Sequence, residues 1–291
     1  MRISTSTCSH EKVLWGTDVT YTCEDSLRAC RKAGFKVMDM NFATYSRNAL
    51  PMTRPDWADW CVRQKALADE LGIELSQAHA HFFALNEQGN ESEEDAELIR
   101  RSIIGAGLMG IKWMVFHPYS LRDGIWYSYK DSKRRNMELF REYAELCAKQ
   151  NVSIALENMI ESENRGRRYC SSTEELIDLH DSLNDPIFGI CWDFGHANLA
   201  QIDQCAALRQ IGKRLKVLHV DDNRGKKDDH LAPYFGTIVW EPIMKTLKEI
   251  GYDGDFTYEI FNFHNGLPDA MQEKTLRYTY ELAEYMLSLA K

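Results

Sequence analysis

The feature of this sequence that most constrains its fold is the strict alternation of strand-like and helix-like segments along the chain. Short apolar runs predict eight strands, at residues 2–7, 36–42, 74–81, 112–117, 152–156, 188–192, 215–220 and 255–260. Apolar residues at helical spacing predict a helix after each strand, at residues 25–33, 57–71, 92–106, 136–149, 172–183, 203–211, 240–250 and 270–290. Such alternation is typical of parallel strands joined by right-handed helical crossovers.

Eight strand–helix units with no segment left over predict an α/β fold that closes on itself, the (β/α)8 TIM barrel. An open sheet that binds a dinucleotide is disfavoured, because no GxGxxG motif follows the first strand. Neither a linker nor a low-complexity stretch divides the 291 residues, of which 44% are hydrophobic. We therefore expect residues 1–291 to form a single domain around one core.

Composition narrows the partners that such a chain can have. The net charge of −9 repels phosphate backbones, so nucleic acid is disfavoured as a partner. The N-terminus has no apolar signal core, and no apolar run approaches the length of a membrane span. The eight cysteines are scattered without a CxxC motif, which is typical of reduced thiols. We expect a soluble, cytoplasmic protein without a membrane partner.

Four predicted strands end in side chains that are able to bind a metal ion: Glu157, Asp193, His219 and Glu259. The carboxyl ends of the strands in a TIM barrel gather at one end and form the active site, so we expect these four to meet. Taken alone, Asp193 and the nearby His196 are equally compatible with a helix cap and a histidine packed beneath it. Four strands that end in the same way favour a functional site.

Three carboxylates and one imidazole form a ligand set that suits Mn²⁺, Mg²⁺, Co²⁺ or Zn²⁺. An ion held in this way leaves room for a neutral polyhydroxy molecule, so the expected partner is a small-molecule carbohydrate substrate. The ion would polarise a carbonyl group of that substrate. It would also stabilise the enediolate that forms when the neighbouring C–H loses its proton.

Other polar and aromatic side chains are expected around this set. His79, His81 and His117 lie near the ends of the third and fourth strands. Asp228 and His230 lie in a charged loop after the seventh strand, where Asp228 is equally compatible with a solvated position. Aromatic residues in the loops after the first four strands would either cover a pocket or form a homo-oligomer contact: Trp15, Tyr21, Tyr45, Phe82, Phe83, Tyr119, Trp126, Tyr127 and Tyr129.

Five motifs give the chain a resemblance to the xylose isomerase-like superfamily, which includes sugar phosphate isomerases and epimerases and AP endonuclease family 2. They are ALEN at 155–158, WDFGH at 192–196, LHVDDN at 218–223, DDHLAP at 228–233 and YEI at 258–260. The resemblance implies a divalent-metal-dependent sugar isomerase or epimerase. It implies one ion bound by Glu157, Asp193, His219 and Glu259, with Glu157 and Glu259 also transferring protons. It also implies that His196 contacts the substrate, and Arg224 resembles the substrate-contacting arginine of ketose 3-epimerases. From their positions at the same end of the barrel, we also expect His81, His117, Asp228 and His230 to bind the substrate.

Two other activities are compatible with the same motifs. A dehydratase of an inosose-type ketone would use the same enediolate. Endonuclease IV, an abasic-site nuclease of this superfamily, holds three zinc ions, and its ligand pattern is partly matched here by His79 or His81, His117, Glu157, Asp193, His196, His219, Asp228, His230 and Glu259. The acidic composition and the mixed charge of the long loops argue against such a phosphodiesterase. One bound ion would favour the isomerase or epimerase, and three would favour the nuclease.

Overall fold

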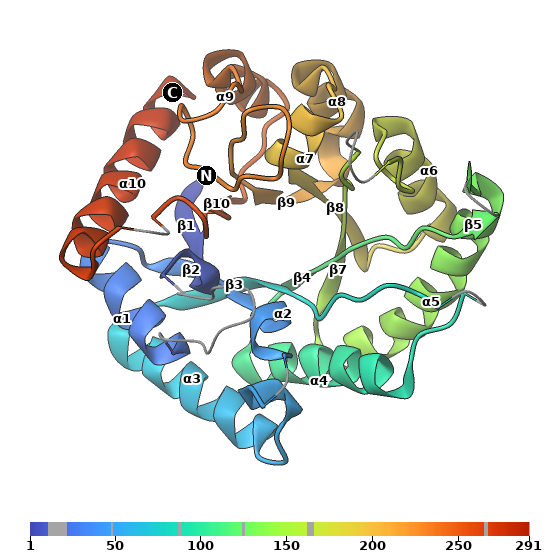
Figure 1. Ribbon diagram of the computed structural model, residues 1–291, viewed down its shortest axis with the longest axis horizontal. Helices are drawn as coiled ribbons and strands as arrows, with labels where there is room; N and C mark the ends of the chain where they lie inside the picture. The colour runs from blue at the N-terminus through green and yellow to red at the C-terminus, as the bar shows by residue number, and fades with distance from the viewer. Residues whose placement is uncertain are drawn as a thin grey trace.

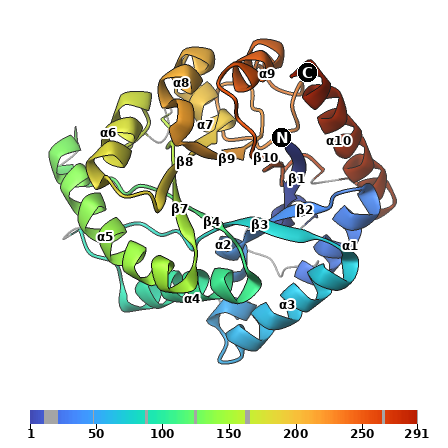
Figure 2. The same cartoon turned by 180° about the vertical axis from the view of Figure 1, so that it is seen from behind.

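The computed structural model describes residues 1–10, 22–47, 49–86, 89–123, 126–161, 166–264 and 267–290. Its centre is a sheet of eight parallel strands inside a ring of helices, visible from both sides in Figures 1 and 2. The strands are β1 (Arg2–Ser6), β2 (Val37–Asn41), β3 (Glu74–His79), β4 (Trp113–Phe116), β7 (Ser153–Glu157), β8 (Phe188–Asp193), β9 (Leu215–His219) and β10 (Asp255–Tyr258). All eight predicted strands are confirmed, with boundaries that differ by no more than two residues.

The sheet closes on itself because its first strand pairs on both sides. In β1, Ser4 is in register with Thr257 of β10 and with Val37 of β2. The other strands follow in chain order as far as β9. Just beyond β9, the Val220 N–H donates to the Thr257 carbonyl over 2.8 Å, and the Glu259 N–H donates to the Val220 carbonyl over 3.1 Å. These bonds join β9 to β10 and confirm the predicted (β/α)8 TIM barrel.

A long helix follows each barrel strand and packs against the outside of the barrel (Figure 1). The helices are α1 (Cys23–Ala33), α3 (Trp57–Leu71), α4 (Glu93–Met109), α5 (Tyr129–Gln150), α6 (Thr173–Leu183), α8 (Gln204–Ile211), α9 (Trp240–Glu249) and α10 (Asp269–Leu289). Helix α3 has the bounds predicted from the sequence, and Gly72 closes it with a left-handed φ of 65°. The alternation predicted from the sequence is therefore present throughout the described residues.

Helix α5 begins at Tyr129, well before the predicted start at residue 136. The polar stretch that opens it lacks apolar spacing, but the side chain of Ser128 accepts the Asp131 N–H and caps the helix. Smaller elements that the sequence did not predict are the antiparallel pair β5 (Arg122–Asp123) and β6 (Trp126–Tyr127), helices α2 (Phe42–Tyr45) and α7 (Phe194–Leu199), and the 3-10 turns Thr7–His10, Pro51–Thr53 and Gly212–Arg214.

Apolar side chains form a large core between the barrel and its helices and a small one inside the barrel. The large core includes the fully buried Trp192 and Phe140. The small core consists of Val115, Ala155, Cys191 and Val217. Its members come from β4, β7, β8 and β9, which are the strands that lead to several of the predicted site residues.

Seven of the eight cysteines are buried, and Cys61, Cys147, Cys170, Cys191 and Cys205 are free thiols. Burial raises the pKa of Cys61 and of Cys147 to about 12, so both remain protonated thiols at neutral pH. Within the described ranges, no helix combines the length and apolar character that a bilayer span requires.

Gly195 in α7 lies directly against the carboxylate of Asp221. Its N–H donates to Asp221 Oδ1 over 3.0 Å, and a Cβ atom at this position would overlap the carboxylate. We predict that Gly195→Ala lowers the free energy of unfolding by about 1–3 kcal/mol through overpacking. Denaturant titration measures this difference. In a variant that already carries Asp221→Gly, Gly195→Ala should lower the free energy of unfolding clearly less. An equal decrease in both backgrounds would contradict overpacking against Asp221.

Candidate metal centre

The carboxyl end of the barrel brings together the four side chains expected to bind one ion. His219 Nδ1 lies 3.0 Å from Glu157 Oε1, 3.5 Å from Glu259 Oε2 and 4.0 Å from Asp193 Oδ2. One ligand atom from each of the four lies within 4.8 Å of the others, and all four residues are buried. Buried carboxylates this close need a compensating positive charge, so the donor set fits a divalent cation.

Asp193 caps a helix and still leaves one oxygen free. Its Oδ1 accepts the His196 N–H over 2.6 Å at the start of α7, whereas its Oδ2 is buried without a hydrogen-bond partner among the described residues. Asn158 holds Asp193 in place, because its side chain accepts the Asp193 N–H over 2.7 Å and donates to the Asp193 carbonyl over 2.8 Å. The helix cap and a metal-ligand role for Asp193 are therefore compatible.

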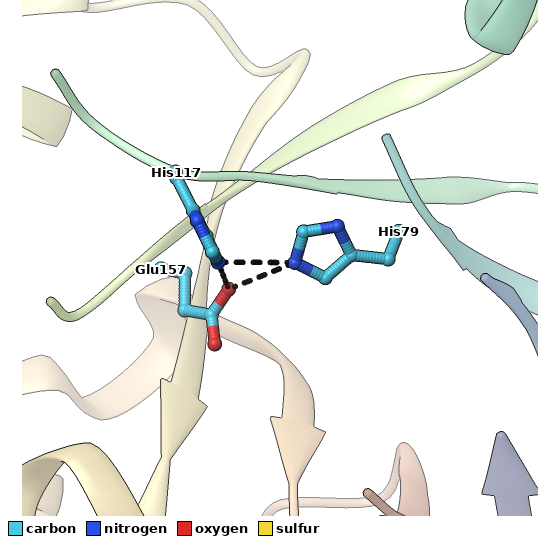
Figure 3. Close-up of side chains that lie close together, drawn as sticks. All are labelled: His79, His117 and Glu157. Carbon is cyan, nitrogen blue, oxygen red and sulfur yellow. Dashed lines mark hydrogen bonds and ion pairs between the residues drawn. The ribbon is translucent and has the colours of Figure 1, made fainter. Parts of the chain in front are cut away.

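His79 and His117 form a second group with Glu157 (Figure 3). His79 Nε2 lies 3.1 Å from His117 Nε2, and Glu157 Oε2 lies 3.4 Å from the former and 3.0 Å from the latter. Glu157 thus links this group to the four-residue group, since its Oε1 faces His219 and its Oε2 faces these two imidazoles.

A third group consists of Asp221, Asp228 and His230, with His196 beside it. Asp228 Oδ2 lies 3.3 Å from His230 Nε2 and 3.6 Å from His196 Nε2. The Asp228 side chain is only 15% exposed, so it does not occupy a solvated position. Sequence reasoning did not assign Asp221 to the site. Its position two residues after His219, at the end of an apolar run, is the signal that could have indicated it.

Asp222 fixes the loop that carries Asp228 and His230. Its backbone exchanges two hydrogen bonds of 2.8 Å with Leu231, and its carboxylate accepts the Ile238 N–H over 3.2 Å and the Trp240 Nε1–H over 3.1 Å. His230 is held in this loop with a left-handed φ of 46°, a conformation that favours glycine. Strain of this kind persists where the surrounding structure imposes it, and it is common at functional sites.

Main-chain carbonyl groups orient three of the histidines. Nδ1 of each ring lies 2.8–2.9 Å from a carbonyl oxygen: His79 from Ala80, His196 from Asn158, and His230 from Glu259. Because a carbonyl oxygen only accepts, each Nδ1 carries the proton, and in the neutral ring the Nε2 lone pair is free. Each Nε2 faces a carboxylate of the site. Histidines that bind metals in proteins are oriented by the same kind of hydrogen bond.

Burial and neighbouring charges shift the pKa values of these groups in different directions. Burial raises the pKa of Asp193 to about 7, an effect that His196 opposes and Glu157 reinforces. Burial alone would also raise the pKa of Glu157, but His219 and His117 outweigh it and hold that pKa well below its usual range. The pKa of His196 is raised, because Asp193 and other carboxylates outweigh the opposing effect of burial. The site therefore combines an ionised Glu157 with groups that retain protons near neutral pH.

A pocket of about 1050 Å³ opens onto these groups, a size typical of sites for small molecules. The site residues that line it are His79, His117, Glu157, His196, Asp228, His230 and Glu259. Asp193 and His219 are not among the described lining residues. Two aromatic rings border the imidazoles: Phe82 stacks on His117 with centroids 5.1 Å apart, and Phe261 lies 3.9 Å from His230.

Two of the predicted substrate-binding residues lie away from the pocket lining. Strand β3 ends at His79, and the chain leaves the barrel before His81, whose Nε2 contacts Asp95 Oδ1 over 2.9 Å. His79 instead lines the pocket. Arg224 is exposed on the loop after β9, where its N–H donates to Asp229 Oδ2 over 3.2 Å.

The aromatic residues of the strand-to-helix loops have different positions. Those that line the pocket are Phe82, Phe83 and Tyr119. Three others contact residues outside the pocket: Tyr45 contacts Trp60, Tyr127 contacts Glu175, and Tyr129 contacts Asp178. Those that lie outside the described residues are Trp15, Tyr21 and the side chain of Trp126.

Comparison with known proteins identifies the family. The profile of the family described as "Xylose isomerase-like TIM barrel" matches residues 27–282. The chain belongs to this family. The resemblance inferred from the five motifs is therefore confirmed.

Several relatives in the xylose isomerase-like family are similar over much of their length. An uncharacterised protein of Methanocaldococcus jannaschii is 30% identical over 74% of this chain and 72% of its own. D-psicose 3-epimerase of Enterocloster bolteae is 26% identical over 70% of this chain and 67% of its own. A probable endonuclease 4 of Acholeplasma laidlawii is 26% identical over 62% of this chain and 66% of its own. An uncharacterised protein of Sinorhizobium fredii is 27% identical over 58% of this chain and 53%, or about half, of its own.

A solved structure shows the same fold. The crystal structure of a D-tagatose 3-epimerase-like protein superposes with a TM-score of 0.76, at 22% identity, over 100% of this chain and 98% of that chain. The barrel described above is therefore the architecture of a known structural group.

We predict that stabilisation by a divalent ion increases with pH. Without an ion, the raised pKa of Asp193 contributes stability that is complete below its usual value of 3.8 and is lost as pH rises through about 7. An ion must displace that proton, so Mn²⁺ should raise the Tm of chelator-treated protein more at about pH 8 than at about pH 6. Scanning calorimetry with and without Mn²⁺ measures the increment. An equal increment at both pH values would contradict a ligand role for Asp193.

Proposed function

We propose that this protein is a divalent-metal-dependent sugar isomerase or epimerase, an enzyme that moves a proton on a carbon beside a carbonyl group. One observation carries this proposal: within the four-residue group, Glu157 and Glu259 are the members that line the pocket. They come from β7 and β10, three strands apart around the barrel, and so approach a substrate from separate directions. The named activity of the D-psicose 3-epimerase relative supports the same reaction class.

The proposed ligands of the ion are Glu157, Asp193, His219 and Glu259, whose oxygen and nitrogen donors suit Mn²⁺, Mg²⁺, Co²⁺ or Zn²⁺. When bound, such an ion would polarise the substrate carbonyl and acidify the adjacent C–H. Glu157 is ionised because its pKa is held low, so it accepts the proton from one face of the carbon. Glu259, after taking a proton from water, delivers it to the other face, and Glu157 releases the proton it accepted to water; the roles reverse for the opposite epimer.

The proposed substrate is a small carbohydrate. His117, His196 and His230 present ring nitrogens to its hydroxyl groups, while Phe82 and Phe261 offer apolar faces. Three arginines also line the pocket, so a phosphorylated sugar is as compatible with it as a free sugar: Arg47, Arg122 and Arg168. An inosose-type dehydratase would use the same two carboxylates and is the neighbouring alternative.

A second candidate function is a metal-dependent phosphodiesterase of the endonuclease IV type. The observation that favours it is the presence of two further ligand groups beside the first, one around His79 and His117 and one around Asp228 and His230. A probable endonuclease 4 is also among the relatives. We place this candidate second because the chain carries a net charge of −9, which opposes binding of a polyanion.

We predict that Glu157→Gln and Glu259→Gln each slow net sugar conversion by roughly 10²-fold or more, because each removes one proton-transfer group. In D₂O, one of the two variants should still exchange the α-hydrogen of the substrate, since exchange on a single face needs only the surviving carboxylate. Proton NMR over a panel of ketoses, aldoses and inososes follows both processes. Glu161→Gln is the matched control, because this carboxylate follows the same strand but binds Ser171 and does not line the pocket.

Wild-type conversion without any solvent deuterium would indicate a hydride shift and contradict the two-carboxylate mechanism. Failure to convert any sugar, together with cleavage of an abasic-site oligonucleotide, would replace the first candidate by the second.

We predict one tightly bound ion per chain after loading with Mn²⁺ or Zn²⁺ and desalting. Asp193→Ala should lose this ion, because it removes a ligand of the four-residue group, whereas His79→Ala should retain it. Elemental analysis of both folded variants measures the stoichiometry. Three ions in the wild type, falling by one in His79→Ala, would support the phosphodiesterase instead.

A further inference from the structure

Exposed apolar side chains gather along one side of the molecule, far from the barrel axis. Of the eleven large hydrophobic residues exposed among the described residues, seven belong to α10 or to the loops before α9 and α10. Five of them form what we call the α10 surface: Tyr234, Phe235, Met271, Tyr278 and Tyr285, each 40–52% exposed. Helix α10 is on the outer ring, between α1 and α9 (Figures 1 and 2). A contiguous apolar surface of this kind on a folded protein marks an interaction site.

The α10 surface is continuous because its loop residues contact the helix. Phe235 lies edge-on to Tyr278 with ring centroids 6.2 Å apart, and Tyr234 lies 6.2 Å from Tyr285. Along α10, Met271, Tyr278 and Tyr285 follow one another at intervals of two helical turns, so they form a single row. Met271 and Tyr285 are equally distant from Tyr278, which gives the row a centre.

Charged residues beside this row are also arranged about Tyr278, with a positive side chain before it and a negative side chain after it along the helix. Lys274 precedes Tyr278 by about one helical turn, and Glu281 follows it by about one turn on the same edge of the row. Both line a hollow of about 300 Å³ next to Tyr278, which α1 borders with Lys32. If α10 meets an antiparallel copy of itself, Lys274 lies level with Glu281 of the partner subunit, and Met271 lies level with Tyr285 of the partner subunit.

We propose that the α10 surface is a dimer interface between two copies of this chain, related by a two-fold axis that passes beside Tyr278. A symmetric dimer uses the same patch on both subunits, so the patch must be complementary to itself. The α10 surface meets this condition in its apolar row and in its charges. An unrelated partner protein would not require an arrangement with this internal symmetry. The interface would also steady one wall of the pocket, because Phe235 packs on Phe263 at 4.7 Å and the adjacent Asn262 lines the pocket.

Sedimentation velocity of the full-length protein tests this proposal without any activity assay. The wild type should sediment as a dimer at micromolar concentration. Tyr278→Glu should raise the dimer dissociation constant on the order of tenfold or more, because it places two like charges together at the two-fold axis. Leu108→Glu is the matched control: Leu108 is 42% exposed on α4, outside the α10 surface, and its replacement should leave the dimer unchanged.

Charge reversal tests the symmetry itself. Lys274→Glu and Glu281→Lys should each weaken the dimer, since each faces like charges across the axis, and the double variant should recover most of the loss. Thermal unfolding of each variant checks that α10 remains folded, because Glu281 also binds Arg277 of its own helix at 3.0 Å. A wild type that stays monomeric would overturn the proposal. So would a dimer that Tyr278→Glu leaves intact, or a double variant no better than the single ones.

Discussion

The arrangement of the site depends on the burial of one carboxylate, that of Glu157. The side chain of this residue is 1% exposed, and each of its oxygens faces at least one imidazole: Oε1 faces His219, and Oε2 faces His79 and His117. Removing an ionised carboxylate from water is costly unless opposite charge surrounds it. His79 and His219, whose pKa values are raised, supply part of that charge, and a cation would supply more. Loss of this carboxylate would therefore disturb the ligand groups on both of its sides together.

Much of the site could be predicted because strand periodicity indicates where each barrel strand ends. Glu157, Asp193 and His219 are the last residues of their strands, and Glu259 directly follows its strand, as their apolar runs suggested. The choice between His79 and His81 could not be made in this way. It depends on where strand pairing stops: the Ala80 N–H still donates to the Val115 carbonyl over 3.0 Å, and the chain then turns away.

Beyond the ends of the strands, alternation no longer indicates which way a side chain points. Asp221 and Asp222 are adjacent residues of the same type, yet Asp221 faces His230 whereas Asp222 anchors the loop through Trp240. Apolar periodicity also did not predict the start of α5. The helix begins where Ser128 caps it, ahead of the first turn with apolar spacing. Sequence patterns thus predicted the regular elements and brought the candidate ligands to one end of the barrel, while local hydrogen bonds decided the details of the connecting segments.

The carbonyl groups that orient His79, His196 and His230 belong to the main chain, and this has an evolutionary consequence. A main-chain acceptor remains in place when the side chain on the same residue is exchanged. Substitutions in the pocket wall, such as at Phe82 or Phe261, therefore leave the orientations of these three imidazoles unchanged. Under the proposed function, the ligand groups and the wall that would select the substrate are therefore able to change independently. A lineage with this barrel is free to acquire new substrates while keeping one set of oriented ligands.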